Sequence, residues 1–444
     1  MSSSEDVPPT ITPLTLTVAP QSTATSTTPT SSSTDWTTYH ANNQRTGYIP
    51  GTPDPHSLSK VWSTQLDGSV YAEPLVVGKH VIVATEGDSL YALDPNTGGV
   101  LWHTNVGTPV PLSSLPCGNI DPLGITGTPV YDPATGLVFA VAEISGHAHI
   151  LVGLDAASGL VKVRRLVDTD GMDPRAHQQR PALALANGMV YIAYGGLDGD
   201  CSDYIGRVVA SSTSGQGPLL VYRVPTPREG GIWATPGPSV DASGNLYVSV
   251  GNGAITSGQW DRSDSVLKLS PTLQLIDAFA PASWAQDNAN DADLGSQGPV
   301  LLPGNFIFAA GKSGNGYLLN ANKLGGIGGS IEEQSVCRSF GGAATVGSTI
   351  FVPCTNGLLQ ITVDANRHMH QGWHASGDIV GSPIVGGHTV YSFSHGVMHA
   401  LDMNSGQLVT SLSVGSANRF VTPTISGASI FIGTNAGITA IKIS

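Results

Sequence analysis

The chain of 444 residues contains 55 glycines and 30 prolines, whereas only 11% of its residues are charged. This composition favours an all-β protein with many tight turns over a helical or wholly disordered chain. The formal net charge of −13 excludes an electrostatic footprint for nucleic acid or for an anionic membrane surface. No apolar run approaches the roughly 20 residues that span a bilayer.

Residues 1–34 differ from the rest of the chain. About half of them are Ser or Thr, and the segment contains no Gly, Lys or Arg. Such a segment cannot bury enough apolar surface to offset its ordering entropy, so we predict a disordered stalk, exposed to O-glycosylation. It lacks the basic and apolar regions of a secretory signal. We therefore expect that an export signal or a lipid anchor has been removed; the alternative is a frayed cytosolic terminus.

The organising pattern is clearest in residues 71–107. Four short runs of β-forming residues, YAEPLVV, HVIVAT, SLYALD and VLWHTNV, are separated by turn residues. This pattern predicts a four-stranded antiparallel meander. One such unit cannot bury both faces of its sheet, so further copies should follow it.

Seven further meanders can be recognised, starting near residues 124, 180, 231, 295, 337, 380 and 419. The last one stops after three strands, and residues 59–66 form a lone strand ahead of the first meander. Pairing these two ends would close a ring and remove its exposed strand edges. Residues 35–444 are therefore predicted to form an all-β, eight-bladed β-propeller of four-stranded antiparallel blades, whose closing blade is shared by N- and C-terminal strands.

Several strings resemble one known family. The run LYALD, followed by NTG and LW within residues 90–102, resembles the repeat of quinoprotein-type (PQQ-like) β-propellers. In that repeat the Asp and the T-G turn join the third strand to the fourth, and a Trp packs between neighbouring blades. Residues 36–48 resemble the family's lead-in, and HQQRPAL (177–183) and CGNIDPLGITGTP (117–129) resemble strings of its secreted bacterial members. The resemblance spans nearly all of the chain from residue 36 and implies the propeller fold, but it leaves the activity open.

The loop lengths predict which rim is functional. If the strands of a blade are A (innermost) to D, the B–C loops and the D–A links between blades emerge on the same rim. The long segments all belong to this set, at about 107–123, 167–179, 195–205, 251–263 and 282–294. Binding groups usually lie on such loops, so we predict a functional rim around blades 2 to 5. The alternative is neutral drift of loop length.

The four cysteines are predicted to form two disulfides. Cys117 lies in a D–A link and Cys201 in a B–C loop, hence on one predicted rim in neighbouring blades. Cys337 and Cys354 lie on strands A and B of the sixth blade, where they can face each other across the hairpin. Bonds 117–201 and 337–354 would indicate an oxidising compartment: periplasm, cell surface or medium. The alternative is four buried free thiols.

The resemblance also raises the question of a cofactor. Eight-bladed quinone-dependent dehydrogenases hold pyrroloquinoline quinone between a ring of two adjacent cysteines and a Trp floor, beside a Ca²⁺ ion. This chain has no adjacent cysteine pair, which argues against that cofactor, and no C-x-x-C-H haem motif. Trp233 opens the fourth blade and is predicted to point into the funnel, as a stacking surface or as a packing residue. Whether the protein is an enzyme stays open.

The predicted ligand-binding residues are Glu73, His177, Gln178, Gln179, Arg180, Trp233 and Asp378. Arg180 and its neighbours are expected to enter the channel mouth, where a guanidinium could hold a carboxylate or a sugar hydroxyl. The alternative is an internal ion pair between Arg180 and either Glu73 or Asp378, which occupy equivalent starts of inner strands.

The link before the fifth blade is unusually rich in side-chain oxygens. The predicted metal ligands within it are Asp287, Asn288, Asn290, Asp291 and Asp293. Such a density of hard oxygen ligands suits Ca²⁺, although the spacing does not match an EF-hand loop. The alternative is a solvated loop of Asx turns.

Taken together, the sequence predicts an exported, monomeric propeller that acts as a binding or scaffold module. It would hold a small molecule, a glycan or a protein at the rim and funnel of blades 2 to 5. Two other functions are kept open: a quinone- or metal-dependent oxidoreductase of the PQQ dehydrogenase type, and a protein-interaction propeller of the outer-membrane-assembly type.

Overall fold

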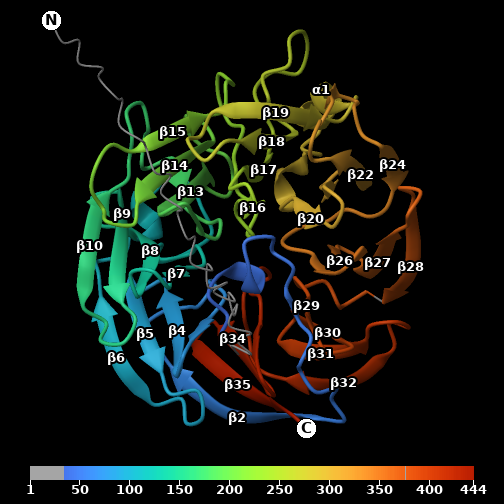
Figure 1. Cartoon of the computed structure of the whole chain (residues 1–444). Helices are drawn as coiled ribbons and strands as arrows, with labels where there is room; N and C mark the ends of the chain where they lie inside the picture. Colours follow the sequence, from blue (N-terminus) through green and yellow to red (C-terminus); the bar gives the residue numbers. More distant parts are fainter. Residues whose placement is uncertain (1–34, 376) are drawn as a thin grey trace, which may run out of the picture. The chain divides into compact units, whose positions relative to one another are not determined.

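The computed structural model describes residues 35–375 and 377–444, so the predicted stalk at 1–34 lies outside the described residues. The described residues form eight antiparallel sheets arranged around a central channel (Figure 1). The predicted eight-bladed β-propeller is thereby confirmed. Within the described ranges, no helix has the length and apolarity that crossing a bilayer would require.

Each blade contributes four strands in the order A, B, C and D. Blade 1 comprises β3 (Leu75–Val77), β4 (His80–Thr85), β5 (Ser89–Leu93) and β6 (Val100–Asn105). Blade 2 comprises β7 (Val130–Asp132), β8 (Leu137–Ile144), β9 (Ala148–Asp155) and β10 (Val161–Leu166). Blade 3 comprises β12 (Ala184–Ala186), β13 (Met189–Gly196), β14 (Arg207–Ser212) and β15 (Leu220–Arg223), with β11 (His177–Gln178) also paired to β13. Blade 4 comprises β16 (Ser239–Val240), β17 (Leu246–Val250), β18 (Ser265–Leu269) and β19 (Leu275–Ala280), with β23 (Gly326–Ile327) added to its outer edge.

The second half of the ring repeats this order. Blade 5 comprises β20 (Val300–Leu302), β21 (Phe306–Ala310), β22 (Asn315–Asn320) and β24 (Glu332–Ser335). Blade 6 comprises β25 (Ala344–Val346), β26 (Thr349–Cys354), β27 (Gly357–Val363) and β28 (Met369–Ala375). Blade 7 comprises β29 (Ile384–Gly386), β30 (Thr389–Ser394), β31 (Val397–Asp402) and β32 (Leu408–Ser413), with β1 (Tyr48–Ile49) parallel to β29.

Blade 8 closes the ring with strands from both chain ends. It comprises β33 (Thr424–Ser426), β34 (Ser429–Thr434), β35 (Gly437–Ile443) and, as its outer strand, β2 (Leu58–Gln65). Strands β2 and β35 pair antiparallel, from Leu58 opposite Ile443 to Gln65 opposite Gly437. This pairing confirms the predicted closing blade, and it leaves no unpaired edge between the first and last blades.

The repeated Trp and T-G turn hold neighbouring blades together. Trp62 on the outer strand of blade 8 donates its indole N–H to the Pro95 carbonyl oxygen of blade 1, at 3.0 Å. Its ring lies against Gly98, where an added Cβ would come within 2.5 Å of the indole. Gly98 has φ +69°, so glycine is required there both for its conformation and for the contact. Trp102 packs on Gly159 of blade 2 in the same way.

The lead-in at residues 36–49 closes one end of the channel. Its blue trace crosses the centre of the ring in Figure 1. Backbone oxygens of Thr37, Asn43, Thr46 and Gly47 accept hydrogen bonds from the inner strands of blades 2, 4, 6 and 7 in turn. Trp36 exchanges two such bonds with the inner strand of blade 1 and is fully buried. The segment therefore joins five blades near the axis.

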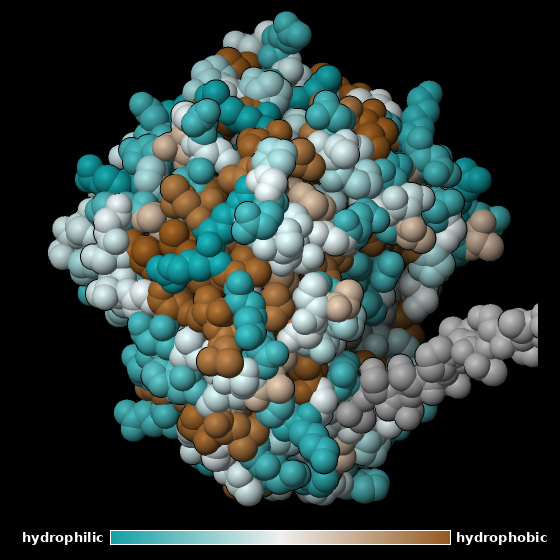
Figure 2. All heavy atoms as spheres, turned by 60° about the vertical axis from the view of Figure 1, so that its left-hand side comes forward, coloured by the Kyte–Doolittle hydropathy of each residue, from teal (hydrophilic) through white to brown (hydrophobic). Residues whose placement is uncertain are grey.

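Apolar side chains that remain exposed lie mainly on the outer strands. Figure 2 shows them as brown patches on the side of the molecule where β6 and β10 lie. Leu101 and Leu160, for example, are 52% and 59% exposed. The core, in contrast, lies between the blades and in their inner strands, where residues such as Val83, Val152 and Ile432 are fully buried.

Two local expectations differ from the structure. The link predicted as a loop at 282–294 contains a short helix, α1 (Trp284–Ala289), and a single 3-10 turn, η3 (Leu294–Ser296). Cys337 precedes β25 instead of lying in it, although it is bonded to Cys354 at the end of β26 as predicted.

Candidate ligand-binding pocket

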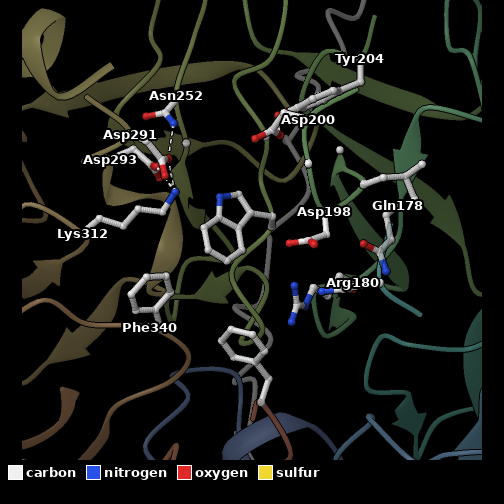
Figure 3. A pocket seen from close by; sticks show the side chains of 18 of the residues that line it. Gln178, Arg180, Asp198, Asp200, Tyr204, Asn252, Asp291, Asp293, Lys312 and Phe340 are labelled. Carbon is white, nitrogen blue, oxygen red and sulfur yellow. Dashed lines mark hydrogen bonds and ion pairs between the residues drawn. The ribbon is translucent and has the colours of Figure 1, made fainter. Parts of the chain in front are cut away.

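A cavity of about 560 Å³ opens at the channel end opposite the A–B turns, on the predicted rim. Its walls come from D–A links and B–C loops, so several blades each contribute one or two side chains to it (Figure 3). The polar and aromatic residues that line it are Asn119, Gln178, Arg180, Asp198, Asp200, Tyr204, Trp233, Asn252, Asp291, Asp293, Lys312, Arg338, Phe340, Asn418, Arg419 and Phe420.

Arg180 is a cavity-lining cation that has an aromatic partner but no oxygen partner among the described residues. It begins the inner segment of blade 3, and its guanidinium carbon lies 4.2 Å from the centre of the Phe420 ring. Among the described residues, no oxygen accepts a hydrogen bond from this guanidinium and no carboxylate lies within 4 Å of it. Burial lowers the pKa of Arg180 to about 10, and Asp198 partly offsets this effect. A buried cation without a bonded anion is costly, so this arrangement favours an anionic ligand.

Two further arginines face the same space. The Arg419 guanidinium carbon lies 4.4 Å from the Phe340 ring centre and 5.2 Å from that of Phe420. Arg338 lies 5.6 Å from Phe340. Neither arginine has an ion-pair partner within the parts of the chain that the structure describes. Stacking on aromatic rings holds these guanidiniums in place while leaving their N–H groups free for a ligand.

Lys312, on the opposite wall, is already neutralised. Its Nζ lies 2.9 Å from Asp293 Oδ2 and also contacts Asp291 Oδ1 (Figure 3). Asn252 donates its amide N–H to the same Asp291 oxygen at 2.6 Å. Burial alone would lower the pKa of Lys312, but the two carboxylates raise it above the ordinary value. Burial raises the pKa of Asp293 despite the ammonium beside it.

Trp233 supplies an aromatic wall between the arginine side and the Lys312 side of the cavity. Its ring centre lies 5.3 Å from the Lys312 Nζ and 6.3 Å from the Phe340 ring centre. Gly195 permits this position, because a Cβ there would come within 2.7 Å of the Trp233 Cβ. The side chain therefore lines the cavity, as the sequence predicted, and offers a surface on which a planar ligand could stack.

The loop between β13 and β14 forms the outer wall. The predicted disulfide between Cys117 and Cys201 is present and ties this loop to the link between blades 1 and 2. Tyr204 donates its hydroxyl to Asp200 Oδ1 at 2.5 Å. Asp198, in the same loop, points toward Arg180 in Figure 3. The disulfide therefore fixes the segment that carries the two acidic side chains nearest the arginine wall.

Not every predicted ligand-binding residue reaches the cavity. Gln178, Arg180 and Trp233 line it, whereas Glu73, His177, Gln179 and Asp378 do not. Glu73 is fully buried beneath the lead-in, where it accepts the His40 backbone N–H at 2.8 Å. Asp378 is exposed between blades 6 and 7. Neither carboxylate forms the ion pair with Arg180 that the sequence left as an alternative.

His177 and Gln179 support the wall from behind. The His177 ring lies 2.7 Å and 3.1 Å from the carbonyl oxygens of Asp173 and Ile205, and burial lowers its pKa to about 4. The Gln179 backbone N–H donates to the Glu143 carboxylate at 2.7 Å. Both residues thus hold the backbone that carries Gln178 and Arg180, and neither of them lines the cavity.

The predicted calcium ligands are divided among different partners. Asp287 accepts from the Ser283 hydroxyl, and Asn288 accepts from the Gly253 backbone N–H. Asn290 is exposed, while Asp291 and Asp293 both contact Lys312. In the described ranges, no group of three or more His, Cys, Asp or Glu residues is arranged to hold a metal ion. The residues present therefore do not form a fitting calcium site, and Ca²⁺ binding stays a prediction from the sequence.

Sequence reasoning missed several residues of this pocket. Asn252 and Lys312 are each the second residue after strand B of their blade, and Phe340 and Phe420 each lie four residues before strand A. The position before strand A is also aromatic in blade 1, at Tyr71, so alignment of the repeats would have indicated the aromatic residues, whereas the position after strand B is Gly in blades 1, 2 and 7 and gives no such indication. The signal lies in the position within the repeat, because no local motif surrounds these residues.

Comparisons with known proteins agree with the fold. Residues 54–171 match a PQQ-repeat family described as outer membrane protein assembly factor BamB. The chain is similar to a polyvinylalcohol dehydrogenase of Sphingopyxis sp. (strain 113P3), with 25% identity over 311 residues. This match covers 62% of the chain but 44% of the relative, so the chain spans less than half the length of that dehydrogenase.

Solved structures show the same architecture at low sequence identity. A quinohemoprotein alcohol dehydrogenase from Comamonas testosteroni superposes with a TM-score of 0.69 at 14% identity, covering 92% of this chain and 80% of the other. A europium-containing methanol dehydrogenase also gives 0.69, at 16% identity with 91% and 90% coverage. BamB from Moraxella catarrhalis gives 0.61 at 13% identity, with 87% and 100% coverage. The chain is therefore an eight-bladed β-propeller, in which residues 54–171 match a PQQ-repeat family.

Proposed function

We propose that this protein is a binding module that holds a planar organic anion in the pocket at the open end of its channel. The observation that carries this proposal is Arg180, a partly buried guanidinium that is stacked on Phe420 and has no bonded oxygen among the described residues. A carboxylate placed there would make two parallel, charge-assisted hydrogen bonds.

The distribution of charge supports an acidic ligand. The cavity is lined by four cationic and four acidic side chains, but the lysine already contacts two of the acids. Three arginines remain without an ion pair, and each of them lies beside an aromatic ring. An anion with more than one carboxylate would satisfy several of these guanidiniums together, while its ring stacks on Trp233.

A second candidate function is an oxidoreductase that uses a quinone. Pyrroloquinoline quinone is a planar tricarboxylate, so the arginine wall fits its acidic groups and Trp233 fits its ring. When bound, it would supply a two-electron acceptor for the oxidation of an alcohol. The similarity to a polyvinylalcohol dehydrogenase supports this candidate, whereas the lack of an adjacent cysteine pair argues against it. Arg180, Arg338 and Arg419 would hold the carboxylates.

The third function, a protein-interaction propeller, is supported by the likeness to BamB alone. Strand addition needs an unpaired edge, and outer strands such as β6 and β10, which each end a sheet, would supply one. This candidate, however, leaves the arginine wall without a role. It is therefore the weakest of the three.

We further propose that the protein works outside the cytosol and as a monomer. Two disulfides indicate an oxidising compartment, which fits the periplasm, the cell surface or the medium. Closure of the ring within one chain supports a monomer, because β2 of the same chain completes blade 8 and no strand from a second copy is needed. Gel filtration with light scattering would test the second point.

Calorimetric titration with pyrroloquinoline quinone tests the binding proposal. We expect the wild-type chain to bind it at one site, and Arg180→Gln to weaken binding by roughly 10- to 100-fold, because a hydrogen bond to a charged group contributes about 1.5–3 kcal/mol. Arg175→Gln is the matched control, since Arg175 lies in the preceding link and is exposed. A wild type that does not bind the acid, or equal affinities for wild type and Arg180→Gln, would refute the proposal.

The choice between binding module and oxidoreductase needs a separate measurement. The protein loaded with the quinone should be offered primary alcohols, secondary alcohols and an artificial electron acceptor. Reduction of the acceptor that is lost in Arg180→Gln would establish the enzyme. Tight binding without any reduction would leave the binding module as the function.

A further inference from the structure

A second cavity of about 390 Å³ lies beside the main pocket on the same rim. Arg419 lines both cavities, so its side chain separates them. Stacking on Phe340 and Phe420 holds its guanidinium on the side of the main pocket. The two cavities are therefore adjacent parts of one rim surface, with a single arginine between them.

The chemistry of the second cavity differs from that of the first. No carboxylate lines it, and Arg419 is its single permanent charge among the described residues. Its polar groups are the hydroxyls of Thr355 and Ser394 and the imidazole of His395, and its apolar walls are Val380 and Ala417. No hydrogen bond of the Thr355 hydroxyl or of the His395 ring is formed with another described residue. These groups can both donate to and accept from a ligand hydroxyl.

The rim is also higher around the main pocket than around the second cavity. Blades 3 and 4 have B–C connections at 197–206 and 251–264, which rise as walls around the main pocket. Blades 6 and 7 have turns of two residues, Thr355-Asn356 and His395-Gly396. His395 has φ +52° and Gly396 φ +81°, the conformation of a tight hairpin turn. The main pocket is consequently walled on one side and low on the side where the second cavity lies.

We propose that the second cavity binds the neutral, hydroxyl-bearing arm of an extended ligand, with an unbranched polyol as the simplest compound of that class. This inference deepens the proposed function and rests on it, because the acidic, planar partner is taken to occupy the main pocket. Arg419 then lies where the two chemistries meet. Thr355 and His395 determine the preference for hydroxyl groups, since each offers a polar atom without a fixed charge, whereas the Ser394 hydroxyl already donates to the Asp378 carbonyl oxygen at 2.5 Å.

Ligand-observed NMR with sorbitol, a linear six-carbon polyol, tests the inference. We expect saturation transfer from the wild type to sorbitol, and at least tenfold weaker binding by Val380→Trp and by Ala417→Trp, since either indole would fill the cavity. Val61→Trp is the matched control, because Val61 is 52% exposed on the outer strand β2. Affinity for pyrroloquinoline quinone, measured by calorimetry, should stay within twofold in all three variants.

The outcomes separate this inference from the proposed function. If sorbitol does not bind the wild type, or if it binds both filled variants as well as the wild type, the inference is overturned. If pyrroloquinoline quinone fails to bind while sorbitol binding is lost in the filled variants, the proposed function falls and the polyol cavity stands. If one filled variant does not fold, the other decides the question.

Discussion

The two ends of the channel each contain a buried arginine, and the comparison between them shows what a ligand site needs. At the closed end, the Arg45 guanidinium donates to Thr38 Oγ1 at 2.6 Å, to Tyr39 O at 3.1 Å and to the carbonyl oxygens of Leu183 and Pro238 at 2.9 and 3.1 Å. At the open end, no oxygen of the described residues accepts from Arg180.

Burial affects the two arginines equally but their bonding differs. It lowers the pKa of both Arg45 and Arg180 to about 10. The acceptors of Arg45 come from the lead-in and from two blades, so its charge is solvated by the protein itself. Arg180 has a flat aromatic partner, Phe420, in place of oxygens. Burial of an arginine therefore does not indicate a ligand site by itself. The lack of hydrogen-bond acceptors around its guanidinium does.

A buried carboxyl group lies near each arginine and fails to neutralise it. Glu73 lies near Arg45 at the closed end, and burial raises its pKa well above the ordinary value. Glu86 lies behind the wall that carries Arg180, and burial raises its pKa to about 8, although Arg180 lowers it somewhat. Burial thus favours the neutral form of both carboxyls, so an external anion remains the natural partner of Arg180.

Replacement of each arginine by methionine gives the largest expected effect. Arg45→Met should lower the free energy of unfolding by about 3–5 kcal/mol, because the acceptors of a buried cation are left without donors. Arg180→Met should change it by less than about 1 kcal/mol, because no hydrogen bond is lost. Denaturant unfolding followed by fluorescence measures both. A comparable loss in the two variants would contradict the distinction between a structural and a ligand-binding arginine.

The two disulfides give a second, smaller contrast. Cys117 and Cys201 are 84 residues apart at the open rim, whereas Cys337 and Cys354 are 17 apart within blade 6. Loop closure in the unfolded chain predicts that the longer loop contributes about 1.4 kcal/mol more. The double serine variants of each pair, unfolded in denaturant, would measure this difference.

The open-rim pair should also affect binding. Cys117→Ser with Cys201→Ser releases the loop that carries Asp198 and Asp200, so we expect the affinity for a planar acid to change several-fold by calorimetry. If both double variants lose equal stability and bind the acid as the wild type does, the rim disulfide has no part in shaping the pocket.

Most of the fold could be predicted from the sequence because it depends on local signals. Turn residues between short β runs predicted the positions of the blades, and the lone strand with Trp62 predicted the pairing that closes the ring. Arg180 was found because it lies in a recognisable string. The acceptors of Arg45, in contrast, come from residues 138 and 193 positions away, and no local pattern carries that information.

The incorrectly placed residues have two physical causes. Glu73 was expected at the channel mouth, but the lead-in covers it, and the sequence does not say where a lead-in will lie. The acidic link was expected to bring its oxygens together as a loop. Instead α1 turns Asp287 and Asn288 toward Ser283 and the backbone of Gly253, because helical backbone sends successive side chains in different directions.

At pH 6 the smallest expected effect is that of Glu86, the carboxyl behind the open-end wall. Its Oε2 accepts the Gly124 backbone N–H at 2.7 Å, which a glutamine oxygen can also do. At pH 6 the wild-type carboxyl is already neutral, so Glu86→Gln should change the free energy of unfolding by less than about 1 kcal/mol. Since the folded pKa is raised from 4.5 to about 8, the folded state holds the proton that the unfolded state has lost, and this stabilisation falls as pH rises through that window. The free energy of unfolding of Glu86→Gln should therefore depend less on pH between pH 5 and 9 than that of the wild type, and it should be higher than the wild-type value at pH 9. Denaturant unfolding at each pH measures both. The exposed Asp170→Asn serves as control. Parallel pH profiles of Glu86→Gln and wild type would show that Glu86 is ionised in the folded protein, and Arg180 would then have an internal counter-charge after all.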